Sequence, residues 1–403
     1  MPSLVWLSSS DWMLHLLCAV ALLSGVLLVL GLVPRLACLT LWASWLSLVA
    51  VGQPFLAFQW DVLLVETAFC AAFFAPPLRG PEREPHPAFR YVMFVLACKV
   101  TLESGIVKLA AGDPTWLDFT ALTYHWWSQP LPTWTSVLIA QLPLWCQQLM
   151  CILMFVLELA IPVMAFGPRL MRLTSAVGLM ALQAGLFAAG NYSFYNLLTF
   201  VLAIPLLDDQ FLRAGPLDSA RGERWPWIIP GLYAALSVAM FLRVDTAVVH
   251  FVRRFDTVNA YGAFAVMTRT RPEIIIEGSA DGETWLPYEF PWKPGDLTRR
   301  PVFIAPWQPR LDWQMWFAAL GNCESNPWVL DLQQRLLTQT PEVLKLFEKN
   351  PFPNAPPRLL RTRVFEYRFA PWSQPGVWWT RSEKGPYCPA VMLGPDGALQ
   401  RAL

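Results

Sequence analysis

Long apolar runs fill the first 243 residues and constrain the fold more than any other feature of this sequence. A helix that crosses a bilayer needs about 20 mostly apolar residues. Eight runs are candidates, at residues 12–33, 36–58, 62–75, 90–110, 145–166, 173–189, 194–207 and 225–242. The third and the seventh are short. We therefore predict an all-α polytopic membrane bundle with about six to eight transmembrane helices.

Charged residues divide the chain into two consecutive parts. Residues 1–243 contain only 12 of the 30 Lys and Arg, although they make up more than half of the 403 residues. The net charge of +1 excludes the nucleic-acid-binding class, which needs a clustered basic face. Composition thus predicts a multi-span transmembrane domain, residues 1–243, and a C-terminal extramembrane domain, residues 244–403.

The placement of arginine predicts how the bundle is oriented. Positive charge near the ends of spans collects on the cytoplasmic side. Alternate connectors carry Arg35, Arg79, Arg83, Arg90, Arg169, Arg172, Arg213, Arg221 and Arg224, and the connectors between them contain no Lys or Arg. We therefore expect the N-terminus and the C-terminal domain on the outer side. That side is the lumen of the endoplasmic reticulum in a eukaryote and the extracytoplasmic face of the cytoplasmic membrane in a bacterium.

Five ionisable side chains lie inside the predicted spans: Glu66, Lys99, Glu103, Lys108 and Glu158. Charge within a bilayer is costly and marks candidate functional groups. Lys99 and Glu103 are four residues apart and share a helix face, whereas Lys108 projects to the opposite side and needs Glu66 or Glu158 as a partner. Two interpretations stay open for Lys108. It forms a structural ion pair or extends toward the interface, or it acts as a base.

Tryptophan and arginine provide candidate binding residues outside the spans. The connector 111–144 contains Trp126 and Trp127. We predict that it forms a short helix on the outer membrane interface, with a partner-binding surface as the alternative. The C-terminal domain has further candidates in Arg310, Asp312, Trp313 and Trp316, together with Trp307, Trp328, Trp372, Trp378 and Trp379. Trp and Arg are common anchors of protein interfaces, and packing of the domain's own core is the alternative.

The C-terminal domain has short β-prone runs separated by turn signals. Residues 273–277 and 284–290 predict a hairpin with its turn at Asp281-Gly282, and further strands are expected at 363–369 and 376–381. Residues 311–320, 327–337 and 341–348 predict helices, with Asn326 and Thr340 as N-caps. The domain is therefore expected to be α+β, with a β-sandwich-like portion.

Catalytic and metal-binding motifs are missing from the sequence. It contains no G-x-S-x-G, no H-E-x-x-H and no glycine-rich phosphate loop, and His250 is the only His of the C-terminal domain. We therefore assign no catalytic residue, metal or cofactor. Cys323 and Cys388 are candidates for a disulfide if the domain lies in an oxidising compartment.

Several segments resemble the lipase maturation factor family. They are GQPFLAFQWD at 52–61, LVE at 64–66, KL at 108–109, GDPTW at 112–116 and LTYH at 122–125, followed by IEGS at 276–279, KPGD at 293–296, RRP at 299–301, RLDW at 310–313 and MWFAA at 315–319. The resemblance extends over residues 3–390. It implies an endoplasmic reticulum membrane protein that helps secreted lipases fold and assemble, with a lumenal C-terminal domain. Family members usually begin with a further span, so this chain is expected to start after it.

A more distant resemblance connects Lys108-Leu109 and Trp116-Leu117 to the horizontally transmembrane superfamily that includes vitamin K-dependent γ-carboxylase, where the corresponding Lys acts as a base. Three hypotheses follow. The first is a non-enzymatic, chaperone-like maturation factor whose partners are the lipid bilayer and secreted lipase clients, contacted through the candidate residues above. The second is a membrane enzyme that uses Lys108. The third is a transporter with Lys99, Glu103 and Glu158 along its path, although no inverted repeat supports it.

Overall fold

The computed structural model describes residues 1–76, 85–213, 225–371 and 373–402, so Arg79, Arg83, Arg221, Arg224 and Trp372 lie outside the described residues. The chain forms two compact units. The membrane unit comprises Met1–Phe119, Gln148–Phe187 and Phe194–Val266, and the C-terminal unit comprises Thr120–Gln147, Ala188–Ser193 and Met267–Leu403. The predicted boundary lies between residues 243 and 244, whereas in this division residues 244–266 belong to the membrane unit and residues 120–147 of the Trp-rich connector to the C-terminal unit.

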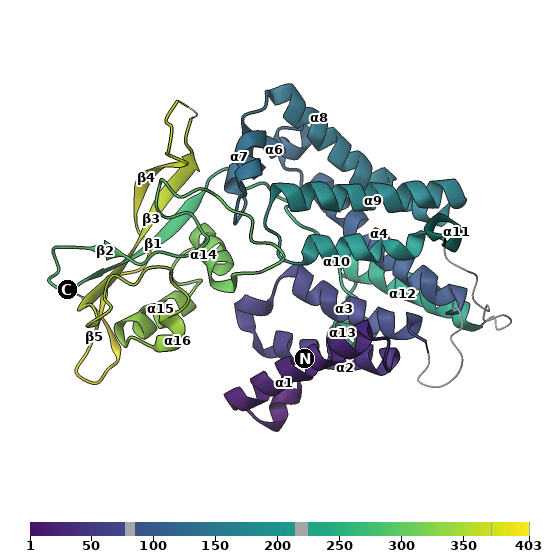
Figure 1. The fold of residues 1–403 in the computed structure, drawn as a ribbon, viewed down its shortest axis with the longest axis horizontal. Helices are drawn as coiled ribbons and strands as arrows, with labels where there is room; N and C mark the ends of the chain where they lie inside the picture. Colours follow the sequence, from purple (N-terminus) through teal and green to yellow (C-terminus); the bar gives the residue numbers. More distant parts are fainter. Residues whose placement is uncertain (77–84, 214–224, 372, 403) are drawn as a thin grey trace. The chain divides into compact units, whose positions relative to one another are not determined.

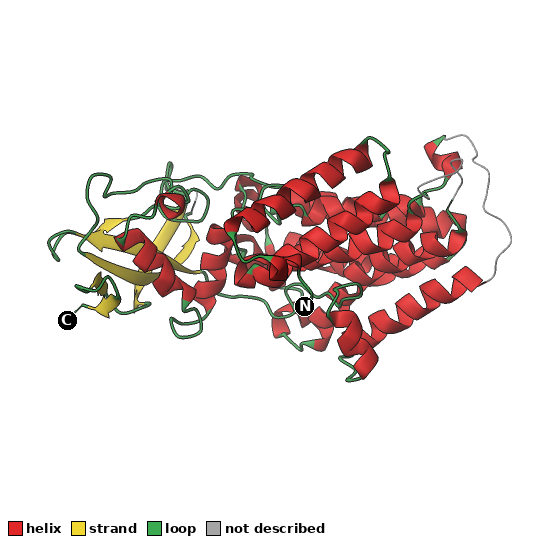
Figure 2. Ribbon diagram, turned by 90° about the horizontal axis from the view of Figure 1, so that it is seen from below, coloured by secondary structure: helices red, strands yellow, loops and turns green. Residues whose placement is uncertain are grey.

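The membrane unit is built from helices (Figures 1 and 2). They are α1 Asp11–Val29, α2 Pro34–Val51, α3 Gln59–Phe74, α4 Pro87–Ala110, α5 Pro114–Leu117, α8 Leu144–Phe155, α9 Arg169–Ala189, α10 Tyr195–Leu202, α11 Asp209–Leu212, α12 Ile228–Phe241 and α13 Ala247–Arg253. The first residues of α8 and the last two of α9 belong to the C-terminal unit. After α8 the chain continues through a π-helical turn, Val156–Ala160, and a 3-10 turn, Pro162–Phe166.

Helices α1 and α4 show the difference between a lipid-facing helix and a central one. In α1 only Met13, Leu17 and Ser24 are buried, and Leu22 remains 72% exposed. Such a helix is apolar on all sides and suits a hydrocarbon environment. In α4, 14 of 24 residues are buried, including the polar ones considered below. The central helix therefore buries several charges, whereas the one Asp, Glu, Lys or Arg of the outer helix is Asp11 in its first turn.

Four helical stretches in the described residues are long and apolar enough to cross a membrane: Asp11–Val29, Pro34–Val51, Leu144–Phe166 and Arg169–Ala189. Two apolar stretches, Tyr195–Leu206 and Ile228–Phe241, are shorter. Helix α3 has 16 residues, and α4 is long enough but carries four charged side chains, Arg90, Lys99, Glu103 and Lys108. The chain is thus a helical membrane protein, and the count of six to eight spans stays a prediction.

The C-terminal unit contains one antiparallel sheet, seen as the strands of Figure 2. Its strands are β1 Pro272–Ser279, β2 Leu286–Pro287, β3 Leu359–Phe369, β4 Trp379–Pro386, β5 Val391–Leu393 and β6 Leu399–Arg401. The order is β2-β1-β3-β5-β6, and β4 pairs with β3. All described strands belong to this single sheet, so the predicted sandwich-like portion is wrong. Helices cover the sheet instead of a second sheet.

The predicted hairpin is confirmed, because Glu277 pairs with Pro287 and Gly278 with Leu286. Gly282 has φ +88°, a left-handed conformation that suits glycine in this turn. The helices of this unit are α6 Ala121–Ser128, α7 Trp134–Ala140, α14 Arg310–Leu320, α15 Trp328–Leu337 and α16 Pro341–Leu344. Helix α15 begins after Pro327 rather than after the predicted cap Asn326, and the Thr340 side chain makes no capping bond to α16.

The connector does not form the predicted single interfacial helix. It folds into α5, α6 and α7, and α7 begins with a capping bond from the Ser136 amide to the Thr133 hydroxyl. Residues 120–147 pack within the C-terminal unit because a buried arginine, Arg271, holds their backbone.

Candidate functional site

Helix α4 forms two buried ion pairs inside the membrane unit. Lys99 pairs with Glu66 of α3, and Lys108 lies 2.8 Å from a carboxylate oxygen of Glu158 in the π-helical turn. All four residues are at most 6% exposed. Buried charges are tolerated when they are paired and hydrogen-bonded. Of the two partners predicted for Lys108, the structure selects Glu158.

The carboxylate of Glu66 is the centre of a satisfied polar network. Its oxygens accept from the Tyr233 and Tyr261 hydroxyls and from the Asn259 side chain, and Lys99 adds the ion pair. Lys99 also donates to the Asn259 carbonyl over 3.0 Å. The network therefore ties α3 and α4 to α12 and to the segment that follows α13. Sequence reasoning did not find Tyr233, Tyr261 or Asn259, because neutral polar residues carry no charge signal.

Glu103 lies on the same face of α4 as Lys99 but does not pair with it in the structure. Its carboxylate accepts a 2.6 Å hydrogen bond from the backbone N–H of Tyr261. Tyr261 is therefore held at both ends, because its hydroxyl donates to Glu66. This fixes the irregular segment around residue 260 against α4.

Lys108 has its hydrogen atoms engaged. Its ammonium donates to both oxygens of Glu158 over 2.8 Å and to the Ser104 carbonyl over 3.3 Å, and it lies 5.5 Å from the Trp116 ring centroid. Gly105 permits this approach, because a Cβ there would lie 2.7 Å from Leu159 Cδ2. A lysine base needs a free lone pair, whereas this ammonium is fixed by a carboxylate. The geometry favours a structural ion pair over a base.

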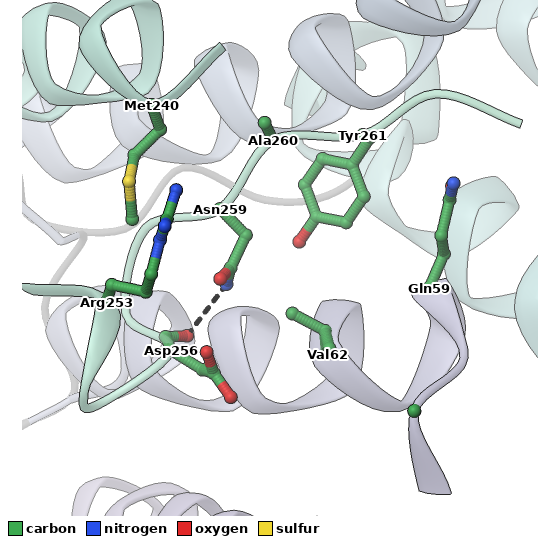
Figure 3. A pocket seen from close by; sticks show the side chains of 9 residues that line it. Gln59, Val62, Met240, Arg253, Asp256, Asn259, Ala260 and Tyr261 are labelled. Carbon is green, nitrogen blue, oxygen red and sulfur yellow. Dashed lines mark hydrogen bonds between the residues drawn. The ribbon is translucent and has the colours of Figure 1, made fainter. Parts of the chain in front are cut away.

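A cavity of about 270 Å³ lies beside the Glu66 network in the membrane unit. Its lining includes Gln59, Met240, Arg253, Asp256, Asn259 and Tyr261. In Figure 3 Arg253 and Asp256 occupy one side, Gln59 the other, and Asn259 and Tyr261 lie between them. Burial raises the pKa of Asp256 from 3.8 to about 6. None of these six residues was a candidate site residue in the sequence prediction.

The C-terminal unit buries a second set of charges. Arg271 and Glu273 at the start of the sheet are fully buried and lie 2.9 Å apart, and Lys293 approaches the other oxygen of Glu273 over 2.9 Å. Arg271 also donates to the carbonyls of residues 127, 129 and 130. One guanidinium thus joins the start of β1 to the end of α6 and the loop that follows it, which explains why residues 120–147 belong to this unit.

The sequence-predicted binding residues lie mostly in the interior of the C-terminal unit. Trp126, Asp312, Trp313 and Trp316 are between 2% and 6% exposed, whereas Trp127 and Arg310 are partly exposed. Two of the buried indoles have hydrogen-bond partners inside the unit: Trp126 donates to the Gln147 side chain, and Trp316 to the Ser128 carbonyl. These buried indoles correspond to the core-packing alternative, since a covered side chain is no surface anchor in this conformation.

Asp312 stabilises a loop from within the core of the C-terminal unit. Its Oδ1 accepts from the backbone N–H groups of Trp292 and Lys293 over 2.9 and 2.8 Å. Burial raises the pKa of Asp312 to about 6, and these two hydrogen bonds oppose the shift.

An aromatic surface is exposed elsewhere on the C-terminal unit. We define it by Trp134, Arg300, Phe303, Trp307 and Trp378. Trp307 is 69% exposed and Phe303 40%. Phe303 packs edge-on against Trp134 at 5.9 Å, and the Arg300 guanidinium lies 5.2 Å from the Trp134 centroid and 5.6 Å from that of Trp378.

The loop that carries this surface is rigidly held. The buried Asn191 accepts from the N–H groups of Ile304 and Ala305 over 2.9 and 3.2 Å, and its amide donates to the Val302 carbonyl over 2.8 Å. Sequence reasoning found Trp307 as an aromatic residue. It missed Arg300 and Phe303 as binding candidates, because their grouping depends on contacts with Trp134, which is more than 160 positions away in the sequence.

Cys323 and Cys388 form a disulfide in the C-terminal unit, with a Cα–Cα distance of 5.2 Å. The pair closes a loop between residues 65 positions apart. It ties the segment after α14 to the segment that leads into β5. No group of three or more His, Cys, Asp or Glu in the described residues is arranged to hold a metal ion.

Comparison with known proteins gives matches across almost the whole chain. The model for the lipase maturation factor transmembrane domain matches residues 1–214, and the model for the lipase maturation factor C-terminal domain matches residues 257–389. The chain belongs to the lipase maturation factor family. Lipase maturation factor 2 of Homo sapiens is 31% identical over 94% of this chain and 72% of its own length. Lipase maturation factor 1 of Mus musculus is 33% identical over 97% and 77%, respectively.

No solved structure matches the chain, so the lipase maturation factor family is identified by sequence. Its two family models separate a membrane part from a C-terminal part, as charge distribution did. Nothing in these matches supports the γ-carboxylase-like alternative for Lys108, in agreement with the engaged ammonium.

Proposed function

We propose that this chain is a membrane-bound maturation factor that assists the folding and assembly of secreted lipases. Its place is the endoplasmic reticulum membrane in a eukaryote or the cytoplasmic membrane in a bacterium, with the C-terminal unit on the lumenal or extracytoplasmic side. The alternation of arginine-bearing and arginine-free connectors supports this orientation. The Cys323–Cys388 disulfide supports it separately, because disulfides persist in oxidising compartments.

The aromatic surface is the proposed client contact. The observation that carries this assignment is Trp307, which is 69% exposed in a loop held by Asn191. Large rigid aromatic side chains beside an arginine are the usual anchors of protein interfaces, and a preorganised loop loses little entropy on binding. The buried Trp126, Trp313 and Trp316 stabilise the unit that presents this surface.

The test is a pair of substitutions, Trp307→Ala with Phe303→Ala, expressed in cells that lack other lipase maturation factors. Removing anchor residues of this kind costs about 2 kcal/mol or more, which is a roughly 30-fold loss of affinity. We expect active secreted lipase and lipase co-purified with the factor to fall together, at unchanged membrane levels of the factor. Trp292→Ala is the matched control, since Trp292 is an exposed Trp (38%) of the same unit outside the aromatic surface. Normal lipase output from the double variant would refute the assignment.

A further inference from the structure

The cavity beside the Glu66 network contains acceptors that no described residue of the protein satisfies. Asp256 is only 3% exposed, and its Oδ2 atom has no hydrogen-bond partner in the described part of the chain. Gln59 Oε1 in the same lining is also buried without a partner there. Buried polar atoms are normally paired, and an unpaired carboxylate is especially costly. The cavity is therefore suited to a ligand that brings N–H donors.

The same cavity presents a cationic side chain. Arg253 ends helix α13 and lines the cavity on the side of Asp256 (Figure 3), and among the described residues it forms no ion pair. Its guanidinium is suited to bind a phosphate group through bidentate hydrogen bonds. The cavity thus offers Arg253 to an anionic group and Asp256 to a cation that carries N–H donors.

The wall between these groups is preorganised. The Asn259 side chain donates to the Asp256 carbonyl over 3.0 Å and to Glu66 over 3.2 Å, and Tyr261 is held by Glu66 and Glu103. A cavity whose walls are fixed by a second set of hydrogen bonds is typical of a binding site. The Glu66 network then has a second role, which is to shape this cavity.

The surroundings of the cavity are apolar and suit a lipid. Helix α13 exposes Val248 by 59% and Phe251 by 61% on its outer side, and Met240 and Val62 contribute apolar lining. A short helix with exposed apolar residues and arginine at its end is characteristic of the membrane interface. Acyl chains would contact α13 while a headgroup enters the cavity.

We propose that this cavity binds the headgroup of an ethanolamine phospholipid, with its phosphate on Arg253 and its primary ammonium on Asp256 and Gln59. A choline headgroup has no N–H and leaves both acceptors unpaired. A serine headgroup adds a carboxylate next to Asp256. The site therefore discriminates by hydrogen-bond donors rather than by charge alone.

The test uses the full chain purified in detergent and mixed with equal amounts of ethanolamine, choline and serine phospholipids that have identical acyl chains. Native mass spectrometry then measures which lipid the protein retains. We expect the ethanolamine lipid to be retained about tenfold over the choline lipid, the size of one charge-assisted hydrogen bond. Asp256→Asn should bring this ratio close to one. Arg253→Gln should weaken retention of all three lipids, whereas its neighbour Arg254→Gln, which does not line the cavity, should not.

Four results would overturn the proposal. The first is equal retention of ethanolamine and choline lipids by the unsubstituted chain, and the second is an unchanged preference for the ethanolamine lipid in Asp256→Asn. The third is an equal loss of retained lipid in Arg253→Gln and Arg254→Gln. The fourth is stronger binding of soluble phosphoethanolamine than of the lipid. The last result would identify a free phosphoamine as the ligand. The comparison of ethanolamine and choline lipids in the unsubstituted chain tests the proposal even if Asp256→Asn fails to fold.

Discussion

The membrane unit and the C-terminal unit both bury charged side chains, but they neutralise them differently. In the membrane unit Lys99 and Lys108 meet carboxylates from other helical segments. In the C-terminal unit Arg271 meets Glu273 and also three backbone carbonyls of the connector. Lys99 and Lys108 each reach one backbone carbonyl, of Asn259 and Ser104, because most helical carbonyls are already bonded, whereas the end of α6 and the loop after it offer Arg271 three carbonyls that need donors. The comparison indicates that both sets of charges hold segments together.

The largest effect is expected at Lys99. Lys99→Met leaves Glu66 buried without its counter-charge, and breaking such a pair costs about 3–5 kcal/mol. We expect loss of trypsin resistance and low levels of folded protein in the membrane. The matched control is Lys99→Met combined with Glu66→Gln, which removes the charge of both partners and should recover part of the loss. Equal damage in the single and double variants would show that the pair is not what stabilises α3 against α4.

Arg271→Met should destabilise the C-terminal unit by about 3 kcal/mol, because buried acceptors lose their donor and Glu273 loses a partner. Urea-dependent proteolysis of the full chain in detergent measures this, with cleavage expected first in the connector 120–147. Arg358→Met, at an exposed arginine of the same unit, is the control and should stay within about 0.5 kcal/mol of the unsubstituted chain. Release of the connector by both variants alike would contradict the role of Arg271.

A smaller, pH-dependent effect is expected at Asp312. Its pKa is raised from 3.8 to about 6 in the folded unit, so the protonated form stabilises the fold below pH 3.8 and this contribution disappears as pH rises through 6. Between pH 4 and 6 the stability from this group should fall by about 1 kcal/mol per pH unit. Asp312→Asn keeps the acceptor for the two N–H groups and should remove this slope. Parallel pH profiles of the two proteins would refute the assignment.

The smallest effect is predicted for the joint replacement of Lys108 by Met and Glu158 by Leu. Exchanging both members of a buried ion pair for apolar residues of similar size is often neutral, so we expect stability within about 1 kcal/mol and unchanged secreted lipase activity. A well-folded double variant that produces no active lipase would revive the hypothesis that Lys108 acts as a base.

The sequence was most informative where a local pattern determines structure. The Asp281-Gly282 turn requires a left-handed residue, and the hairpin formed there. Charge density separated the two family domains for a similar reason, since hydrocarbon excludes charge. The sandwich-like portion and the single helix in the connector were wrong, because sheet pairing and the attachment of the connector by Arg271 depend on residues far apart in the chain.

For the candidate sites, sequence identified the charged groups but not all of their partners. It allowed Glu66 or Glu158 for Lys108, and only the packing permitted by Gly105 selects Glu158. The Trp residues of α14 were candidates for binding, but sequence does not show which indoles become covered. The cavity of Asp256 was inaccessible to sequence reasoning, because its lining comes from α3, α12, α13 and the segment after α13.

Site-specific photo-crosslinking tests the central claim, that buried charges stabilise the two units and the exposed aromatic surface binds the client. Trp307 and Phe303 would each be replaced by benzoyl-phenylalanine in the full chain, with Trp292 as the control position, during synthesis of a secreted lipase. We predict a lipase adduct at residues 307 and 303 and little at residue 292. Adducts at 292 with none at 303 or 307 would contradict the account.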